Sequence, residues 1–126
     1  MLKQIVTVLA ILLLAGCSSE TQVKAWGMIE EDNALLVDVR TPQEFNSGHL
    51  PGAKLIPVDQ LKQRLAEFGP NKNRPIVVYC KSGSRSGKAE QFLKSQGYTN
   101  VFNGGGYNAM KNAKDDYETS KLATSS

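Results

Sequence analysis

The chain has 126 residues, of which 40% are hydrophobic and 21% are charged, and its formal net charge is +3. This length suits one globular domain and leaves no room for a second full core. Charges of both signs are interspersed without a dense basic block, which argues against nucleic acid as a partner.

The first residues differ in character from the rest of the chain. Lys3 supplies a positive start, and the nearly continuous apolar run over 5–14 has the length of a signal-peptide core and is short for a membrane span. Leu14-Ala15-Gly16-Cys17 then resembles the lipobox of bacterial lipoproteins. The resemblance implies a signal peptide over 1–16 and a mature protein that begins with acylated Cys17. The alternative is an ordinary secretory signal, in which Cys17 survives as a free thiol.

The lipobox resemblance also carries an expectation about location. Ser18 follows the cysteine, where lipoproteins retained in the inner membrane often carry Asp, so we expect an outer-membrane anchor that leaves the domain facing the periplasm. Each buried methylene of an acyl chain contributes about 0.8 kcal/mol to membrane binding. The chain has two cysteines, so acylation of Cys17 leaves Cys80 as the thiol of the domain. Such a cysteine in an oxidising compartment is either buried and inert or kept for its reactivity.

Strands and helices are predicted to alternate along the rest of the chain. A short polar tether is expected at 17–23, one domain at 24–115, and a disordered polar tail at 116–126. The expected strands are continuous apolar runs, at 34–39, 54–58, 75–79 and 100–102. The expected helices lie at 42–47, 59–68, 86–96 and 107–114. Thr41-Pro42-Gln43-Glu44 is a capping-box start for the first of them. The alternation predicts an α/β fold with a mostly parallel sheet and helices on both faces.

The segment Cys80-Lys81-Ser82-Gly83-Ser84-Arg85-Ser86 follows the most apolar strand. In parallel sheets, sites form where the carboxyl end of a strand runs into a helix. Backbone N–H groups and the helix N-terminus favour an anion there, and Gly83 allows the loop to curl tightly. The Cys80 side chain can occupy that centre as a thiolate, and the same loop would hold an anionic substrate. The expected substrate-binding residues add hydroxyls and positive charges: Lys81, Ser82, Gly83, Ser84, Arg85 and Ser86.

Spacing argues against three other kinds of site. The run from Gly83 to Ala89 is one residue short of a nucleotide-binding G-x-x-x-x-G-K-[ST] loop and lacks its hydroxyl. A thioredoxin-like site needs a second cysteine where Gly83 stands. Familiar cysteine phosphatases, like arsenate reductases, need a longer loop, with Arg six residues after Cys, whereas Arg85 is five after Cys80.

Three blocks of sequence together resemble the rhodanese family of single-domain sulfurtransferases. They are Leu36–Ala53, with its Glu44-Phe45 and Gly-His-Leu-Pro-Gly-Ala segments, then the Cys80–Ser86 loop, then Gly105-Gly106. One departure is Met110, where many members have Trp. The resemblance implies that Cys80 takes sulfur from a donor such as thiosulfate, holds it as a persulfide, and passes it to cyanide or a thiol. It implies no organic cofactor and no metal, and we expect a monomer.

Four further features are expected to be structural, two of them with a functional alternative. His49 could act as a base, but its turn context favours a hydrogen-bonded structural imidazole. Asp38 and Arg40 stand near a strand end; Arg40 is expected to pair with Glu44 or Asp38, and a place in the substrate pocket is the alternative. Gly104–Gly106 is expected to form a tight turn packed on the Cys80 loop, and Trp26 a core or edge position.

A second hypothesis assigns the domain to a different class of function. It would be a membrane-tethered sulfur or redox-stress binding module that passes a persulfide from Cys80 to a docked partner protein. Thiosulfate:cyanide turnover separates this hypothesis from the enzyme.

Overall fold

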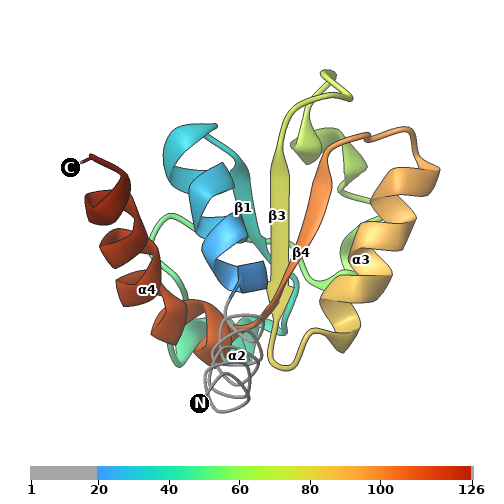
Figure 1. Cartoon of the computed structure of the whole chain (residues 1–126). Helices are drawn as coiled ribbons and strands as arrows, with labels where there is room; N and C mark the ends of the chain where they lie inside the picture. Colours follow the sequence, from blue (N-terminus) through green and yellow to red (C-terminus); the bar gives the residue numbers. More distant parts are fainter. Residues whose placement is uncertain (1–19, 126) are drawn as a thin grey trace, which may run out of the picture.

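The computed structural model describes residues 20–125, which contain a four-stranded parallel sheet in the order β2-β1-β3-β4 (Figure 1). Every neighbouring pair of strands is parallel. The strands are β1 (Leu35–Asp38), β2 (Lys54–Leu55), β3 (Ile76–Cys80) and β4 (Val101–Gly106). The predicted α/β class is therefore confirmed.

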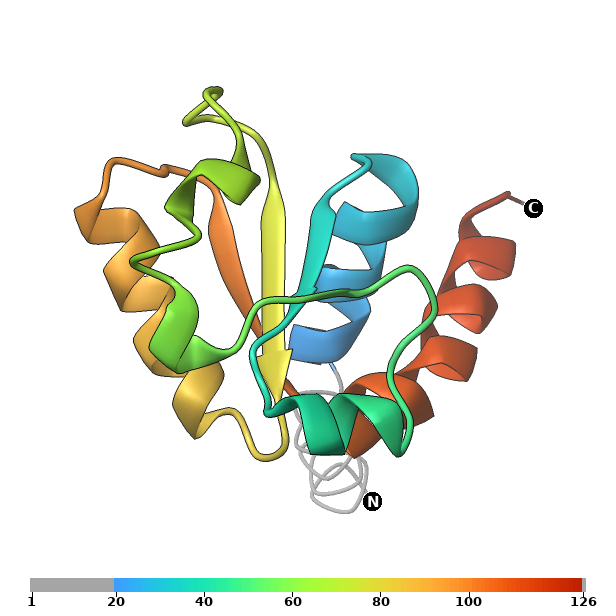
Figure 2. The same ribbon diagram turned by 180° about the vertical axis from the view of Figure 1, so that it is seen from behind.

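Helices cover both faces of the sheet. A helix over 20–31 and α4 (Tyr107–Ser125) pack on one face, in front of the strands in Figure 1. The other face carries α3 (Ser84–Ser95) and two short 3₁₀ segments, η1 (Val58–Gln60) and η2 (Leu65–Phe68), which come to the front in Figure 2. The short helix α2 (Pro42–Asn46) follows β1. The carboxyl ends of the strands, α2 and the start of α3 lie at one end of the molecule, the lower end in Figure 1.

Each face of the sheet has its own apolar core, because successive side chains of a strand point to opposite faces. On β3, Val78 and Cys80 face the α3 side, where they join Leu93 and Phe68. Val77 and the next alternate side chain, Tyr79, face the helix over 20–31 and α4. All five residues of β3 are buried, as expected for a central parallel strand.

The two ends of the domain contain more helix than predicted. Residues 20–23, expected within the tether, belong to the helix over 20–31, where Trp26 is buried and its indole N–H donates to Met110 O at 2.7 Å. The disorder expected for the polar tail at 116–126 is wrong over 116–125, because α4 continues to Ser125. Met110, Ala113 and Tyr117 form a buried stripe at helical spacing, which anchors this helix to the sheet. The predicted signal peptide, Cys17 and residues 18–19 lie outside the described residues.

Three internal boundaries also differ from the predictions. The second strand ends after Leu55: Ile56 and Val58 still donate backbone N–H groups to Asp38 O and Val39 O, but Pro57 between them already stands at the start of η1. The helix expected at 59–68 is instead η1, a turn and η2, although two of its apolar side chains, Leu61 and Phe68, are buried as the spacing indicated. The tight turn expected at Gly104–Gly106 is strand: Val78 pairs with Asn103 and Tyr79 with Gly105, which leaves Gly104 as a bulge.

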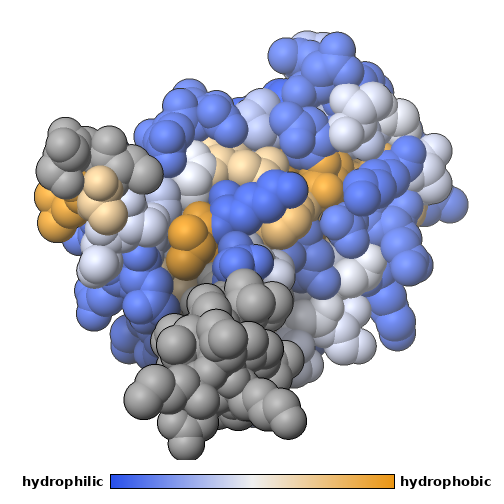
Figure 3. All heavy atoms as spheres, in the orientation of Figure 1, coloured by the Kyte–Doolittle hydropathy of each residue, from blue (hydrophilic) through white to orange (hydrophobic). Residues whose placement is uncertain are grey.

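Hydrophilic side chains cover most of the surface seen in Figure 3, with smaller apolar areas between them. Over residues 20–125, none of the helices combines the length and the apolar character that a membrane span requires.

Candidate active site

Cys80 is the last residue of β3, and it is buried and free of any disulfide. The backbone N–H of Gly83 donates to its Sγ at 3.0 Å, and the Ser86 hydroxyl lies 3.3 Å from the same atom. The loop closes this tightly because Gly83 has φ +96°, in the left-handed region that suits glycine. The chain then enters α3 at Ser84, so the sulfur lies at the first turn of a helix, as predicted.

The surroundings of the sulfur stabilise a thiolate. Burial has the largest single effect and by itself raises the pKa of Cys80. The Ser86 hydroxyl and the backbone N–H groups of Ser86, Ser82 and Gly83 act in the opposite direction, and together they leave the pKa below the ordinary thiol value. A thiol with a lowered pKa in a loop of hydrogen-bond donors is chemically a nucleophile.

Arg85 is paired within the protein, and its expected contact with substrate stays a prediction. Its guanidinium donates twice to the Glu44 carboxylate, at 2.7 and 3.0 Å, which ties the start of α3 to α2. This hydrogen bonding, opposed by desolvation and aided by Thr41, holds the pKa of Glu44 at about 2. The sequence indicated Glu44 as part of the capping box, and the structure contains that box. The sequence near Glu44 gave no indication that the same carboxylate also pairs with Arg85.

Lys81, Ser82 and Ser84 are exposed on the loop, whereas Ser86 is fully buried beneath it. A substrate that approaches Cys80 therefore meets the first three, and their contact with substrate stays a prediction.

Asp38 and Arg40 form a buried ion pair at the end of β1. The Arg40 guanidinium donates to both carboxylate oxygens, with distances of 2.7 to 3.0 Å, and also to Gly48 O at 2.7 Å. Its charged carbon lies 4.7 Å from the centre of the Tyr107 ring and 5.7 Å from that of Tyr79. The predicted pairing of Arg40 with Asp38 is confirmed. Arg40 also lines a surface hollow next to the Cys80 loop. The residues around this hollow are Arg40, Gln43, Glu44, Ser47, Lys81, Tyr107 and Asn108.

His49 has structural contacts. Its ring stacks on Phe45 with centroids 3.7 Å apart, and its Nδ1 lies 2.9 Å from Phe45 O. The predicted hydrogen-bonded imidazole is confirmed.

Asn103 is a part of the site that the sequence analysis missed. Its Oδ1 lies 2.7 Å from the Ser86 hydroxyl, and its Nδ2 donates to Gly83 O at 3.1 Å. Both of these partners also contact the Cys80 sulfur. Asn103 directly precedes the glycines of β4, which were expected to pack on the Cys80 loop, and this position in the sequence could have indicated it.

The glycines of β4 let that strand lie directly against the loop. A Cβ on Gly106 would lie 2.5 Å from Lys81 O, and one on Gly83 would lie 3.4 Å from Gly105 Cα. A side chain on Gly106 would therefore displace the loop, whereas Gly83 is restricted mainly by its positive φ. The expectation that this glycine run packs on the Cys80 loop is confirmed.

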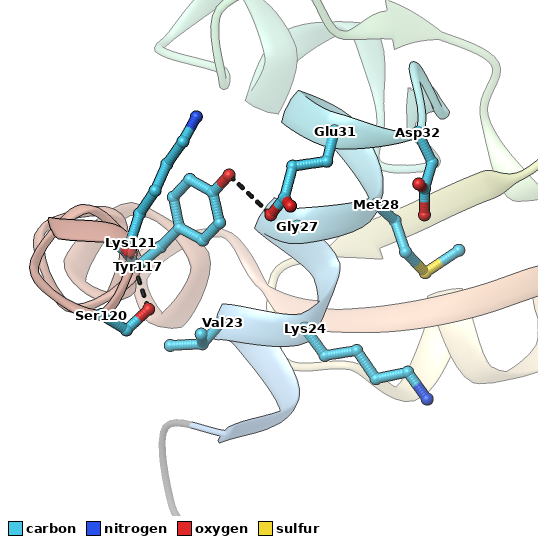
Figure 4. A pocket seen from close by; sticks show the side chains of 9 residues that line it. All are labelled: Val23, Lys24, Gly27, Met28, Glu31, Asp32, Tyr117, Ser120 and Lys121. Carbon is cyan, nitrogen blue, oxygen red and sulfur yellow. Dashed lines mark hydrogen bonds between the residues drawn. The ribbon is translucent and has the colours of Figure 1, made fainter. Parts of the chain in front are cut away.

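A second hollow lies away from Cys80, between the helix over 20–31 and α4 (Figure 4). The Tyr117 hydroxyl crosses it to donate to Glu31 at 3.0 Å. The Cys80 side chain points to the opposite face of the sheet, so this groove is separate from the site. Among residues 20–125, no three His, Cys, Asp or Glu side chains gather as a metal site would require.

The fold and the loop define a small parallel α/β domain with a nucleophilic cysteine at the carboxyl edge of its sheet. Residues 21–113 match the model of the rhodanese-like domain, and the chain belongs to that family. It is 43% identical over 70 residues to thiosulfate sulfurtransferase PspE from Escherichia coli K12, an alignment that covers 56% of this chain and 67% of that protein. It is 40% identical over 76 residues to a sulfurtransferase from Allochromatium vinosum, covering 60% and 69% of the two chains.

Solved structures agree with this assignment. A rhodanese from E. coli, solved with anions, has a TM-score of 0.58 and 39% identity, and the match covers 60% of this chain and 89% of that one. The human single-domain sulfurtransferase TSTD1 has a TM-score of 0.63 and 30% identity, with coverages of 72% and 91%. The names of these relatives support a sulfur-transfer role.

Proposed function

We propose that the protein is a thiosulfate sulfurtransferase that works through a persulfide on Cys80. The observation that carries the proposal is the Cys80 sulfur held between the Gly83 N–H and the Ser86 hydroxyl, at 3.0 and 3.3 Å. Donors in this arrangement stabilise a thiolate before reaction and a terminal persulfide sulfur after it.

The reaction consists of two displacements at sulfur. The Cys80 thiolate attacks the outer sulfur of thiosulfate, a new S–S bond forms, and the old S–S bond breaks as sulfite leaves with its electron pair. Cyanide or a thiolate then attacks the outer sulfur of the persulfide, and Cys80 leaves as a thiolate. The products are thiocyanate or an acceptor persulfide, and the enzyme returns to its starting state, as in other covalent catalysis.

The residues of the loop have different parts in this mechanism. Lys81 is exposed beside Cys80, where its charge attracts a dianionic donor. Backbone N–H groups hold the sulfur, and the Arg85–Glu44 pair fixes the start of α3.

Steady-state kinetics with the purified domain test this proposal. We expect parallel double-reciprocal plots with thiosulfate and cyanide, and a kcat/KM for thiosulfate above that for mercaptopyruvate. The matched control is Cys80→Ser, which changes one atom and removes the nucleophile. Preference for mercaptopyruvate would contradict the substrate assignment. Persulfide formation without turnover by any small acceptor would contradict the enzyme and favour a carrier for a partner protein.

We also propose that the domain is anchored by lipid at Cys17, in the cell envelope. The support is the Leu14-Ala15-Gly16-Cys17 sequence after an apolar run. Mass spectrometry of the mature N-terminus should find acyl groups on Cys17, and Cys17→Ser should release the domain or block processing. Cleavage at another position would contradict the anchor.

A further inference from the structure

One uncharged side chain on β4 contacts both of the residues that donate to the Cys80 sulfur, Gly83 and Ser86. Asn103 Nδ2 donates to Gly83 O at 3.1 Å, while Oδ1 accepts from Gly105 N–H at 2.9 Å. These two bonds fix the amide orientation, because one needs a donor and the other an acceptor. The third contact places the same Oδ1 2.7 Å from the Ser86 hydroxyl.

The Ser86 hydroxyl therefore stands between two acceptors, and it has a single proton to donate. Asn103 Oδ1 lies at 2.7 Å and Cys80 Sγ at 3.3 Å. When the cysteine is protonated its sulfur is a weak acceptor, and the hydroxyl proton is better placed on Asn103. When the cysteine is a thiolate, a charged acceptor competes with a neutral amide, and charge-assisted hydrogen bonds are about twice as strong.

We propose that Asn103 is a positioning residue for Cys80: it holds Gly83 and shares the Ser86 proton, which turns from Asn103 to the sulfur when the thiolate forms. This inference deepens the proposed function and rests on it, because there the thiolate is the nucleophile. In the second displacement Cys80 leaves as a thiolate, and the same hydroxyl would be ready to receive it.

The charged side chains near Cys80 are either paired with one another or exposed, so they do not compete with Asn103 for the Ser86 hydroxyl. Asp38 from β1 is paired with Arg40, and Arg85 from α3 is paired with Glu44. Lys81 is exposed on the loop. The sequence of β4, VFNGGG, contains no titratable side chain. Asn103 therefore acts through the direction of one hydroxyl proton, and it has no charge of its own to titrate.

A double-mutant cycle tests the proposal by measuring the pKa of the Cys80 thiol from the pH dependence of iodoacetamide alkylation. Asn103→Asp replaces the amide with a stronger acceptor and a charge. We expect it to raise the thiol pKa by about one unit, which is roughly a tenfold slower alkylation near neutral pH. In a Ser86→Ala background, the new charge and the lost bond to Gly83 O still act but the competition for the hydroxyl proton is gone, so the shift from Asn103→Asp should be clearly smaller. Asn100→Asp, at the exposed start of the same segment, is the matched charge control and should leave the pKa unchanged.

Equal shifts from Asn103→Asp in the two backgrounds, or no shift in either, would overturn the proposal. The cycle reports on the thiol without requiring sulfur transfer. Absence of turnover in a protein that shows the expected coupling would therefore reject the proposed function and leave the role of Asn103 standing.

A measurement on the unmutated chain covers the case in which the Asp variant does not fold. Gly105 N–H donates to the same Oδ1 that Ser86 would release, so its bond should shorten when the thiolate forms. We expect the Gly105 amide proton resonance to move downfield with the Cys80 titration, and to stay flat in Ser86→Ala. A resonance that follows the titration equally in both proteins would contradict the turn of the Ser86 hydroxyl from Asn103 to the sulfur.

Discussion

Glu44 and Arg85, which are 41 residues apart in the chain, form a two-bond ion pair with distances of 2.7 and 3.0 Å. The pair joins α2 to the first turn of α3, directly after the Cys80 loop. The same carboxylate also accepts from the Thr41 backbone N–H at 3.1 Å, so it completes a helix cap and fixes the loop at once. The positive charge of Arg85 is therefore balanced within the protein before any donor arrives.

Glu44→Gln should flatten the acid dependence of stability. The pKa of Glu44 in the folded protein is about 2, below its ordinary value of 4.5, so its stabilising effect is complete above pH 4.5 and is lost as the pH falls toward 2. Urea unfolding between pH 5 and pH 2 should show a shallower loss of unfolding free energy in the variant than in the unmutated protein. Part of this pH dependence of the unfolding free energy should remain in both proteins, because the pKa of Glu67 is also about 2. Glu118→Gln, which removes an exposed carboxylate, is the control, and a slope unaffected by Glu44→Gln would contradict the pair.

Arg85→Ala should lower kcat/KM for thiosulfate by roughly ten- to a hundredfold, the range expected for losing a charge-assisted interaction. The physical reason is that it leaves the Glu44 carboxylate, a negative charge, uncompensated beside the path of an anionic donor. The double variant Glu44→Gln/Arg85→Ala should recover part of the loss. If the double variant is as slow as Arg85→Ala alone, the guanidinium itself contacts the donor, as the sequence first suggested.

Much of the fold could be predicted because its signals are local. The buried run of β3 and the Thr41–Glu44 capping box each lie within a few residues, and both are present as expected. The predictions for the two ends of the domain, a tether and a disordered tail, were wrong for a physical reason. Trp26 and Tyr117 hold polar segments in place by burial against distant partners, which composition does not show.

The site also contains residues that the local sequence indicated and residues that it did not. Cys80 and its donors Gly83 and Ser86 are within seven residues of one another, so one stretch of sequence indicated the nucleophile and its environment. The partners of the loop could not be predicted, because Glu44 and Asn103 reach it from other elements. Contacts of this kind depend on how α2 and β4 pack, and a single sequence contains no periodicity that reports it.

Gly106→Ala should damage the site, whereas Gly27→Ala should not. A Cβ on Gly106 would lie 2.5 Å from Lys81 O, a backbone atom that cannot turn aside, so the loop must move. A misplacement of about 1 Å in a catalytic loop costs on the order of a hundredfold in rate. A Cβ on Gly27 meets nothing nearer than 3.5 Å, and in a helix this change should stabilise by up to about 1 kcal/mol. Steady-state kinetics and urea unfolding of both variants check the pair, and full activity in Gly106→Ala would contradict the close contact.

Asp38→Asn should destabilise the domain strongly. Asp38 is fully buried and the Arg40 side chain is 6% exposed, so the substitution leaves a buried cation without its partner. Breaking such a pair costs about 3–5 kcal/mol of unfolding free energy. Glu90→Gln is the matched control, because it removes one member of the exposed Lys94–Glu90 pair at 3.4 Å, and should change stability by less than about 1 kcal/mol. Equal costs for the two substitutions would show that burial does not distinguish the pairs.

The most direct test of the account is the mass of the protein after incubation with thiosulfate. In a Cys17→Ser variant Cys80 is the one remaining cysteine, since the chain has two. We predict a gain of one sulfur, about 32 Da, by the persulfide chemistry of reactive thiols, located at Cys80 and removed again by cyanide as thiocyanate forms. Cys80→Ser should show neither the gain nor thiocyanate, with its fold intact. A Cys80→Ser protein that still takes up sulfur, or an unmutated loop that takes up none, would contradict the central claim that Cys80 carries the sulfur.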